Sequence, residues 1–197
     1  MTTLRTTLFK ILLVIGMSLV GATPSFAQAI TVRGLIDTAS GKLSLVTKYD
    51  VIYQLETYNS NVRYDLTRLR QGDYLVARGN VDEISKRVTI EAIESLGLRE
   101  LIGTWSSTRL EVYEFQDFTR LNLYVPNQAR DSIEIAGKYN YAVAPDHGDR
   151  YSIFLSDNRS VLVGTFEFKN QRLQLTVLDP KTGRVSQNIS LSPLTVK

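Results

Sequence analysis

From residue 30 onward the chain alternates between short runs of β-forming residues and turn signals, and this rhythm restricts it to β-structure. After residue 103, a turn-forming segment follows about every ten residues. Consecutive short strands joined by tight turns form an antiparallel meander, and eight of them remove their exposed edges by closing into a barrel. We predict eight strands at 104–107, 109–115, 119–125, 138–144, 150–155, 161–168, 172–178 and 185–191, with residues 132–136 as an extension or a further short strand.

The first half carries a different pattern of five strands interrupted by one helical turn. The strands are predicted at 30–37, 43–47, 51–56, 74–82 and 88–96, and residues 58–61 are predicted as loop. Leu66 and Leu69 lie three residues apart, which indicates a helical turn that ends at Gly72. Gly79 falls inside a strand, where glycine marks a bulge or a close approach of two backbones.

The stretch from Leu101 to Ser107 divides these two patterns and contains Trp105, the only tryptophan of the chain. The link from Leu96 to Leu101 has no Pro- or Ser-rich spacer, so we expect two domains, 30–98 and 101–197, that pack directly on each other.

Residues 1–29 have the features of a signal peptide. Arg5 and Lys10 precede an apolar segment that is short for a membrane span, and small residues allow cleavage after Ala27 or Ala29. The alternative is a leader that stays attached as an anchor. We expect an exported protein, periplasmic or extracellular or in the lumen of a bacterial membrane system, with no membrane span after cleavage.

Charge argues against nucleic acid as a partner. Without Arg5 and Lys10, the 23 basic residues fall to 21 against 20 acidic ones. A nearly neutral chain lacks the surplus cations that phosphate contacts need. Tyrosines 49, 53, 58 and 64 offer base-stacking rings, but half-buried strand and loop tyrosines with hydrated hydroxyls are the better interpretation.

The chain has little material for catalysis or metal binding. It contains no cysteine and one histidine, His147, in a turn between Asp146 and Asp149. A metal there would need more nitrogen or sulfur ligands, so a solvated turn is the better interpretation. We expect no enzyme activity, no catalytic residue, no metal and no cofactor.

The first half resembles small bacterial OB-fold domains over residues 30–98. The resemblance is carried by Gly34, by Tyr53-x-Leu55, and by the run Leu66-x-x-Leu69-x-x-Gly72-Asp73 that continues to Gly79. It implies a five-stranded barrel in which the two leucines close one end and Gly72-Asp73 turns the chain into the next strand. OB-fold domains often bind oligonucleotides or sugars.

The second half is similar to lipocalins at Gly103-x-Trp105, followed by eight strands. The resemblance implies an up-and-down barrel closed at one end by the indole, although the strands are short and the lipocalin cysteine pair and C-terminal helix are absent. Trp105 is then either a ligand contact or a core plug. If the barrel holds a small apolar ligand, the residues that we expect to line the site are Trp105, Tyr113, Phe115, Tyr139, Tyr141 and Phe166.

Two functions remain after these exclusions. One is an interaction or assembly module of the cell envelope that contacts a protein partner through its barrel surfaces. The other is a carrier or sensor that binds a small apolar ligand inside the lipocalin-like barrel. A hollow barrel interior would favour the second function, and a filled one the first.

Overall fold

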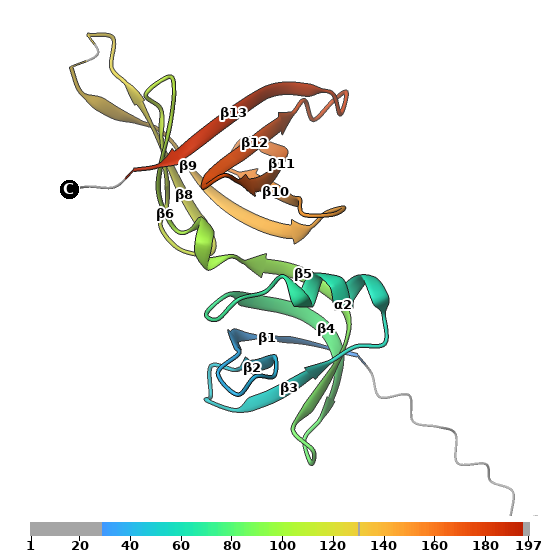
Figure 1. Ribbon diagram of the computed structural model, residues 1–197. Coiled ribbons are helices and arrows are strands. Elements are labelled where there is room, and N and C mark those ends of the chain that lie inside the picture. The colour runs from blue at the N-terminus through green and yellow to red at the C-terminus, as the bar shows by residue number, and fades with distance from the viewer. Residues whose placement is uncertain (1–28, 130, 195–197) are drawn as a thin grey trace, which may run out of the picture.

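The computed structural model describes residues 29–129 and 131–194, so the predicted leader and its cleavage positions lie outside the described residues. The protein is all-β, with 58% strand and 7% helix, as the sequence predicts. Two compact parts lie one above the other (Figure 1). Within the described ranges, no helix has the length and apolar character needed to span a membrane.

The N-terminal part is a closed circuit of five strands. β1 pairs with β2, β2 with β3, β3 with β5 in parallel, β5 with β4, and β4 again with β1. The inward side chains Leu45, Leu75 and Val88 are fully buried. The five strands are β1 (Ile30–Asp37), β2 (Ser44–Val46), β3 (Ile52–Glu56), β4 (Tyr74–Asp82) and β5 (Arg87–Gly97).

Helix α2 (Ser60–Thr67) is longer than the single turn that the sequence predicts. Residues 60 and 61 were predicted as loop, and this is wrong because the Asn59 side chain caps the helix. Its oxygen accepts hydrogen bonds from the backbone N–H groups of Asn61 and Val62, which lets the helix begin early. Leu66 and Leu69 are buried, in agreement with their predicted place in the core.

The C-terminal part is the predicted closed barrel of eight antiparallel strands. Each strand pairs with the next along the chain, and the last pairs with the first through Leu191 and Ser107. The strands are β6 (Gly103–Ser107), β7 (Val112–Phe115), β8 (Arg120–Pro126), β9 (Ile133–Pro145), β10 (Tyr151–Ser156), β11 (Val161–Lys169), β12 (Arg172–Leu178) and β13 (Val185–Pro193).

Two strands start more than one residue away from their predicted positions. β9 starts at Ile133, so the short stretch 132–136 is mostly the beginning of this long strand. β7 starts at Val112 instead of residue 109. The cause is a tight turn in which the N–H of Ser107 donates to the carbonyl of Glu111, with Leu110 in the left-handed region at φ 64°.

The link between the parts is itself part of the core. The short helix η2 (Arg99–Leu101) follows β5, and both Leu98 and Leu101 are buried. Leu96 of β5 pairs with Val143 of β9, so all thirteen strands belong to one continuous sheet. The link is therefore an ordered segment, and the division into two domains at this point stays a prediction.

Gly79 combines both roles that the sequence allows for it. The β4–β5 register shifts between Arg78 and Gly79, and a Cβ at Gly79 would lie 2.3 Å from the carbonyl oxygen of Thr89. The backbone of β5 therefore occupies the space that any other side chain would need.

Replacing Gly79 by Ala should lower the free energy of unfolding by about 1–3 kcal/mol, since the strands must separate to admit a methyl group. The neighbouring exposed residue provides the control, because Arg78→Ala should change stability by no more than about 0.5 kcal/mol. Urea unfolding followed by circular dichroism measures both. Equal stability of the two variants would contradict the close approach.

Candidate functional site

The six aromatic residues expected to line a ligand site lie within the walls and core of the eight-stranded barrel. Trp105, Tyr113, Phe115, Tyr141 and Phe166 are buried, and Tyr139 is half-buried. The five buried residues belong to one hydrophobic core, and Tyr139 packs against it. Phe115 meets the edge of Tyr141 at 5.2 Å between ring centroids, whereas Phe166 contacts Tyr151 and Phe168 at 5.3 and 5.7 Å.

Trp105 is held by a buried hydrogen bond. Its indole N–H donates to the carbonyl oxygen of Leu101 at 2.9 Å, four residues earlier in the chain. The ring also lies 6.2 Å from that of Phe168. The indole therefore fixes the end of the link against the first strand of the barrel, which fits the role of a core plug.

Two tyrosines of the predicted set use their hydroxyl groups in local structure. The hydroxyl of Tyr141 donates to the carbonyl oxygen of Asp117 at 2.6 Å, and burial raises its pKa well above the usual range. The hydroxyl of Tyr113 donates to Glu111 at 3.4 Å, and its pKa is raised first by burial and then by that carboxylate. Both phenols are therefore neutral at physiological pH.

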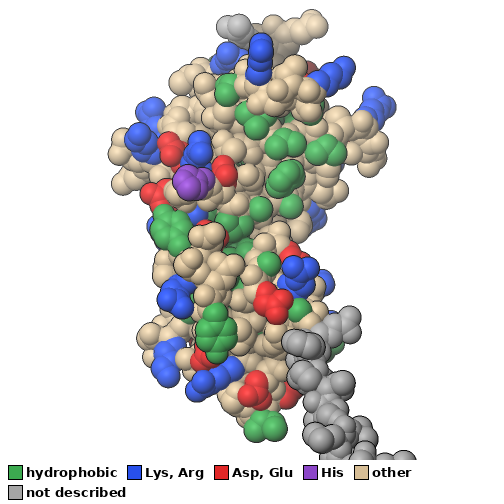
Figure 2. All heavy atoms as spheres, turned by 90° about the vertical axis from the view of Figure 1, so that its right-hand side faces the viewer, with side chains coloured by type: hydrophobic (Ala, Val, Ile, Leu, Met, Phe, Trp, Pro, Cys, Tyr) green, Lys and Arg blue, Asp and Glu red, His purple; other side chains and the backbone are tan. Residues whose placement is uncertain are grey.

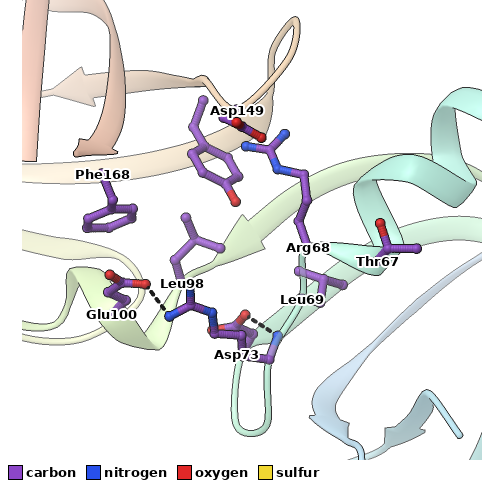
Figure 3. Close-up of a pocket in the computed structure, with 10 residues that line it drawn as sticks. Thr67, Arg68, Leu69, Asp73, Leu98, Glu100, Asp149 and Phe168 are labelled. Atoms are coloured by element: carbon purple, nitrogen blue, oxygen red, sulfur yellow. Dashed lines mark hydrogen bonds and ion pairs between the residues drawn. The ribbon is translucent and has the colours of Figure 1, made fainter. Parts of the chain in front are cut away.

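A pocket of about 350 Å³ lies where the two parts meet, and we take it as the candidate site (Figure 3). Side chains from α2 and the segment after it face side chains of the C-terminal barrel across this junction. The lining is mixed in charge and includes two aromatic rings. It consists of Thr67, Arg68, Leu69, Arg70, Asp73, Leu98, Glu100, Asp149, Tyr151 and Phe168.

Arg68 connects the two sides of the junction pocket. Its guanidinium lies 4.0 Å from the ring centroid of Tyr151, and its Nη2 donates to the carbonyl oxygen of Arg150 at 3.2 Å. Nη1 is buried without a hydrogen-bond partner and is 3.6 Å from the carboxylate of Asp65. A cation over an aromatic face is attracted by the ring quadrupole, more strongly when water is excluded. This contact therefore attaches the end of α2 to β10.

A second contact lies next to Arg68. The Tyr64 hydroxyl donates to Asp149 at 3.0 Å, from α2 to the hairpin between β9 and β10. That hairpin also contains His147, which is exposed in a turn. Across the described residues, no group of three or more potential metal ligands occurs. Asp149 thus joins this hairpin to helix α2 in the other half of the protein.

Asp73 forms the floor of the junction and is almost completely buried. One carboxylate oxygen accepts from the N–H of Arg70 at 2.8 Å, and the other accepts from the N–H of Arg99 at 2.7 Å. Burial raises the pKa of Asp73, and the two backbone N–H groups partly oppose this. The carboxylate thus ties the end of the helical segment to η2. Beside it, the exposed ion pair of Arg70 and Glu100 at 2.6 Å adds little stability.

An aromatic contact also joins the two parts. The ring of Phe118, in the turn before β8, stacks on Tyr74 of β4 at 5.9 Å between centroids. Gly97 lies directly beneath Phe118, where a Cβ would come within 2.6 Å of the ring. The polar and aromatic contacts together thus fix the two parts against each other.

No family model matches this chain, and neither a curated protein nor a solved structure is similar enough to it to count as a match.

The sequence does not predict the junction pocket. Arg68, Asp149 and Tyr151 have no local signal, since the hydrogen bonds that join the two sides span 82 and 85 residues. Asp73 does have a signal, because it ends the Leu-x-x-Leu-x-x-Gly-Asp pattern. Its predicted role was the turn into β4, and the structure adds the bond to Arg99.

The plug role of Trp105 predicts that Trp105→Ala lowers the free energy of unfolding by about 3–5 kcal/mol, through a cavity and an unpaired carbonyl. Trp105→Phe should lower the free energy of unfolding by less, because phenylalanine keeps most of the ring volume. Thermal unfolding monitored by circular dichroism compares them. An alanine variant that stays fully folded but no longer binds a partner would instead identify Trp105 as a ligand contact.

Asp73→Ala should lower the free energy of unfolding by about 2–4 kcal/mol at neutral pH, since two buried N–H groups lose their acceptor. Glu94→Ala, an exposed change on β5, is the control and should be nearly neutral. Because the folded pKa of Asp73 is raised, the folded wild type binds more protons than the unfolded chain. Its stability should therefore fall as pH rises through that pKa. Urea unfolding over an acidic pH series should show this component in the wild type and not in the variant.

Proposed function

We propose that this chain is a non-catalytic, exported protein of the cell envelope that acts as an interaction or assembly module through the outer surfaces of its barrels. The observation that carries the proposal is a row of apolar side chains on the outside of the eight-stranded barrel. Exposed apolar patches are costly in water and commonly mark sites where another macromolecule binds.

The outer apolar row crosses five neighbouring strands, β9 to β13. Ala142 pairs with Phe154, Phe154 with Val163, Val163 with Leu178, and Leu178 with Val185. Opposed residues of antiparallel strands share one face of the sheet. Phe154 is 42% exposed and Val185 58% exposed, so this face is the outer one. On the face drawn in Figure 2, hydrophobic side chains gather over this barrel.

The packing inside the barrel gives less support to a carrier function. Phe115, Phe166 and Ile153 are among the most completely buried side chains of the protein, and Trp105 closes the end next to the link. Buried side chains of this size take up room that an apolar ligand would need. The surface role needs no such space, which is why we prefer it.

The finer description of the two barrels is part of the proposal. A five-strand circuit with one parallel pair, β3 with β5, and a helix before β4 supports an OB-like first barrel. A consecutive eight-strand meander opened by Gly103-x-Trp105 supports a lipocalin-like second barrel. The leader pattern of residues 1–29 supports export. An exported chain would meet its partner in the envelope.

The proposal predicts that Phe154→Ser reduces recovery of an envelope protein partner by at least about tenfold, because a central exposed ring anchors the contact. The matched control is Thr165→Ser, two residues from Val163 on the same outer face of β11. The tagged full chain would be incubated with bacterial envelope extract, and bound proteins identified by mass spectrometry. Circular dichroism checks the fold of both variants. Recovery of the same partner by wild type and Phe154→Ser would contradict the proposed surface.

A further inference from the structure

A second surface lies on the N-terminal barrel, and it does not depend on the outer apolar row. Helix α2 crosses one end of this barrel, and beside it lies a hollow of about 850 Å³. The hollow is bounded by α2, the loop between β1 and β2, and the end of β3. Its floor includes Leu55, Leu66 and Leu69, which belong to the hydrophobic core. The barrel end is thus already closed, and the hollow lies outside that closure.

The rim of the hollow carries an aromatic ring that the fold does not use. Tyr58, in the loop between β3 and α2, is 87% exposed. It directly precedes Asn59, the residue that caps α2, so its backbone is held close to the helix. An exposed tyrosine beside an apolar floor is the type of residue that anchors protein contacts, since it combines a large apolar ring with a polar hydroxyl.

The rim is also basic. Lys42 and Arg63 line the hollow together with one acidic residue, Glu56. The carboxylate of Glu56 is paired with Arg87 at 3.1 Å, which leaves the other two cations in excess. Among residues 29–129 and 131–194, neither Lys42 nor Arg63 has a carboxylate within 4.0 Å. Arg63 is held in place because its Nη2 donates to the carbonyl oxygen of Thr57 at 3.1 Å.

We propose that this hollow binds an acidic peptide segment of a partner protein, with one large apolar side chain inserted against the leucine floor. An anchor of this kind would lie over the outer side of these leucines and beside the exposed Tyr58 ring. Neighbouring Asp or Glu residues would pair with Lys42 and Arg63, and such complementarity determines which partner is accepted. A basic segment would be rejected by the same two cations.

The test uses a displayed library of short random peptides, selected on the purified full chain. The enriched peptides should carry a Phe, Leu or Trp flanked by Asp or Glu. Synthetic, fluorescein-labelled copies are then titrated by fluorescence anisotropy. The double variant Lys42→Glu/Arg63→Glu should weaken binding at least about tenfold, and Tyr58→Ala should weaken it less. Raising the salt concentration should also weaken binding to the wild type.

The charge-matched control is Lys169→Glu/Lys181→Glu, at two exposed positions of the other barrel, one at the end of β11 and one in the turn after β12, and it should bind as the wild type does. Enrichment of basic peptides, enrichment of none, or equal binding by both double variants would overturn the proposal. So would a dimer of the full chain that the Lys42→Glu/Arg63→Glu change dissociates, because the occupant would then be a second copy. Phe154→Ser should leave peptide binding unchanged. The experiments can therefore show separately whether the outer apolar row binds a partner and whether the hollow binds a peptide.

Discussion

The carboxylate of Asp73 is the contact on which the joined structure most depends. It accepts backbone hydrogen bonds from both Arg70 and Arg99, and so it connects the segment after α2 with the segment that leads into the second barrel. A buried acceptor with two backbone donors is difficult to replace, because each donor left unpaired costs about 1–3 kcal/mol. The N-terminal circuit of strands and the eight-stranded barrel therefore meet at a fixed point in the chain.

Around this point the junction uses three kinds of contact. The β5–β9 pairing of Leu96 with Val143 continues the sheet, Arg68 lies over Tyr151, and Phe118 stacks on Tyr74. The junction therefore combines polar and aromatic contacts. Closure of both barrels leaves few strand edges open to other chains, and interactions must then use side chains on the outer surfaces and in the hollows.

Much of the fold could be predicted from periodicity and turn chemistry. The strands Ile30–Asp37, Tyr74–Asp82 and Arg172–Leu178 have the predicted boundaries, because their alternation is uninterrupted and clear turn residues flank them. The start of α2 was missed because it depends on the Asn59 cap, and the start of β7 because Leu110 adopts a left-handed turn conformation. In both cases one side chain or one backbone angle outweighed the secondary-structure preference of the surrounding residues.

The candidate site was much less predictable. The similarity to lipocalins suggested Trp105, Phe115 and Phe166 as interior residues, but it could not distinguish a filled barrel from a hollow one, since that depends on how the rings pack across strands. The junction depends on contacts such as Tyr64 with Asp149, whose partners are separated by most of one barrel in sequence. A single sequence contains no local signal for such pairs.

The rigid link has a consequence for recognition. Because Leu98 and Leu101 are buried and Trp105 bonds to Leu101, the two barrels lose their relative freedom during folding and not when a partner arrives. A partner that touches both barrels would form its second contact at high effective concentration. Two individually weak surfaces could then give firm attachment, provided that the partner matches the separation set by a few residues around Asp73.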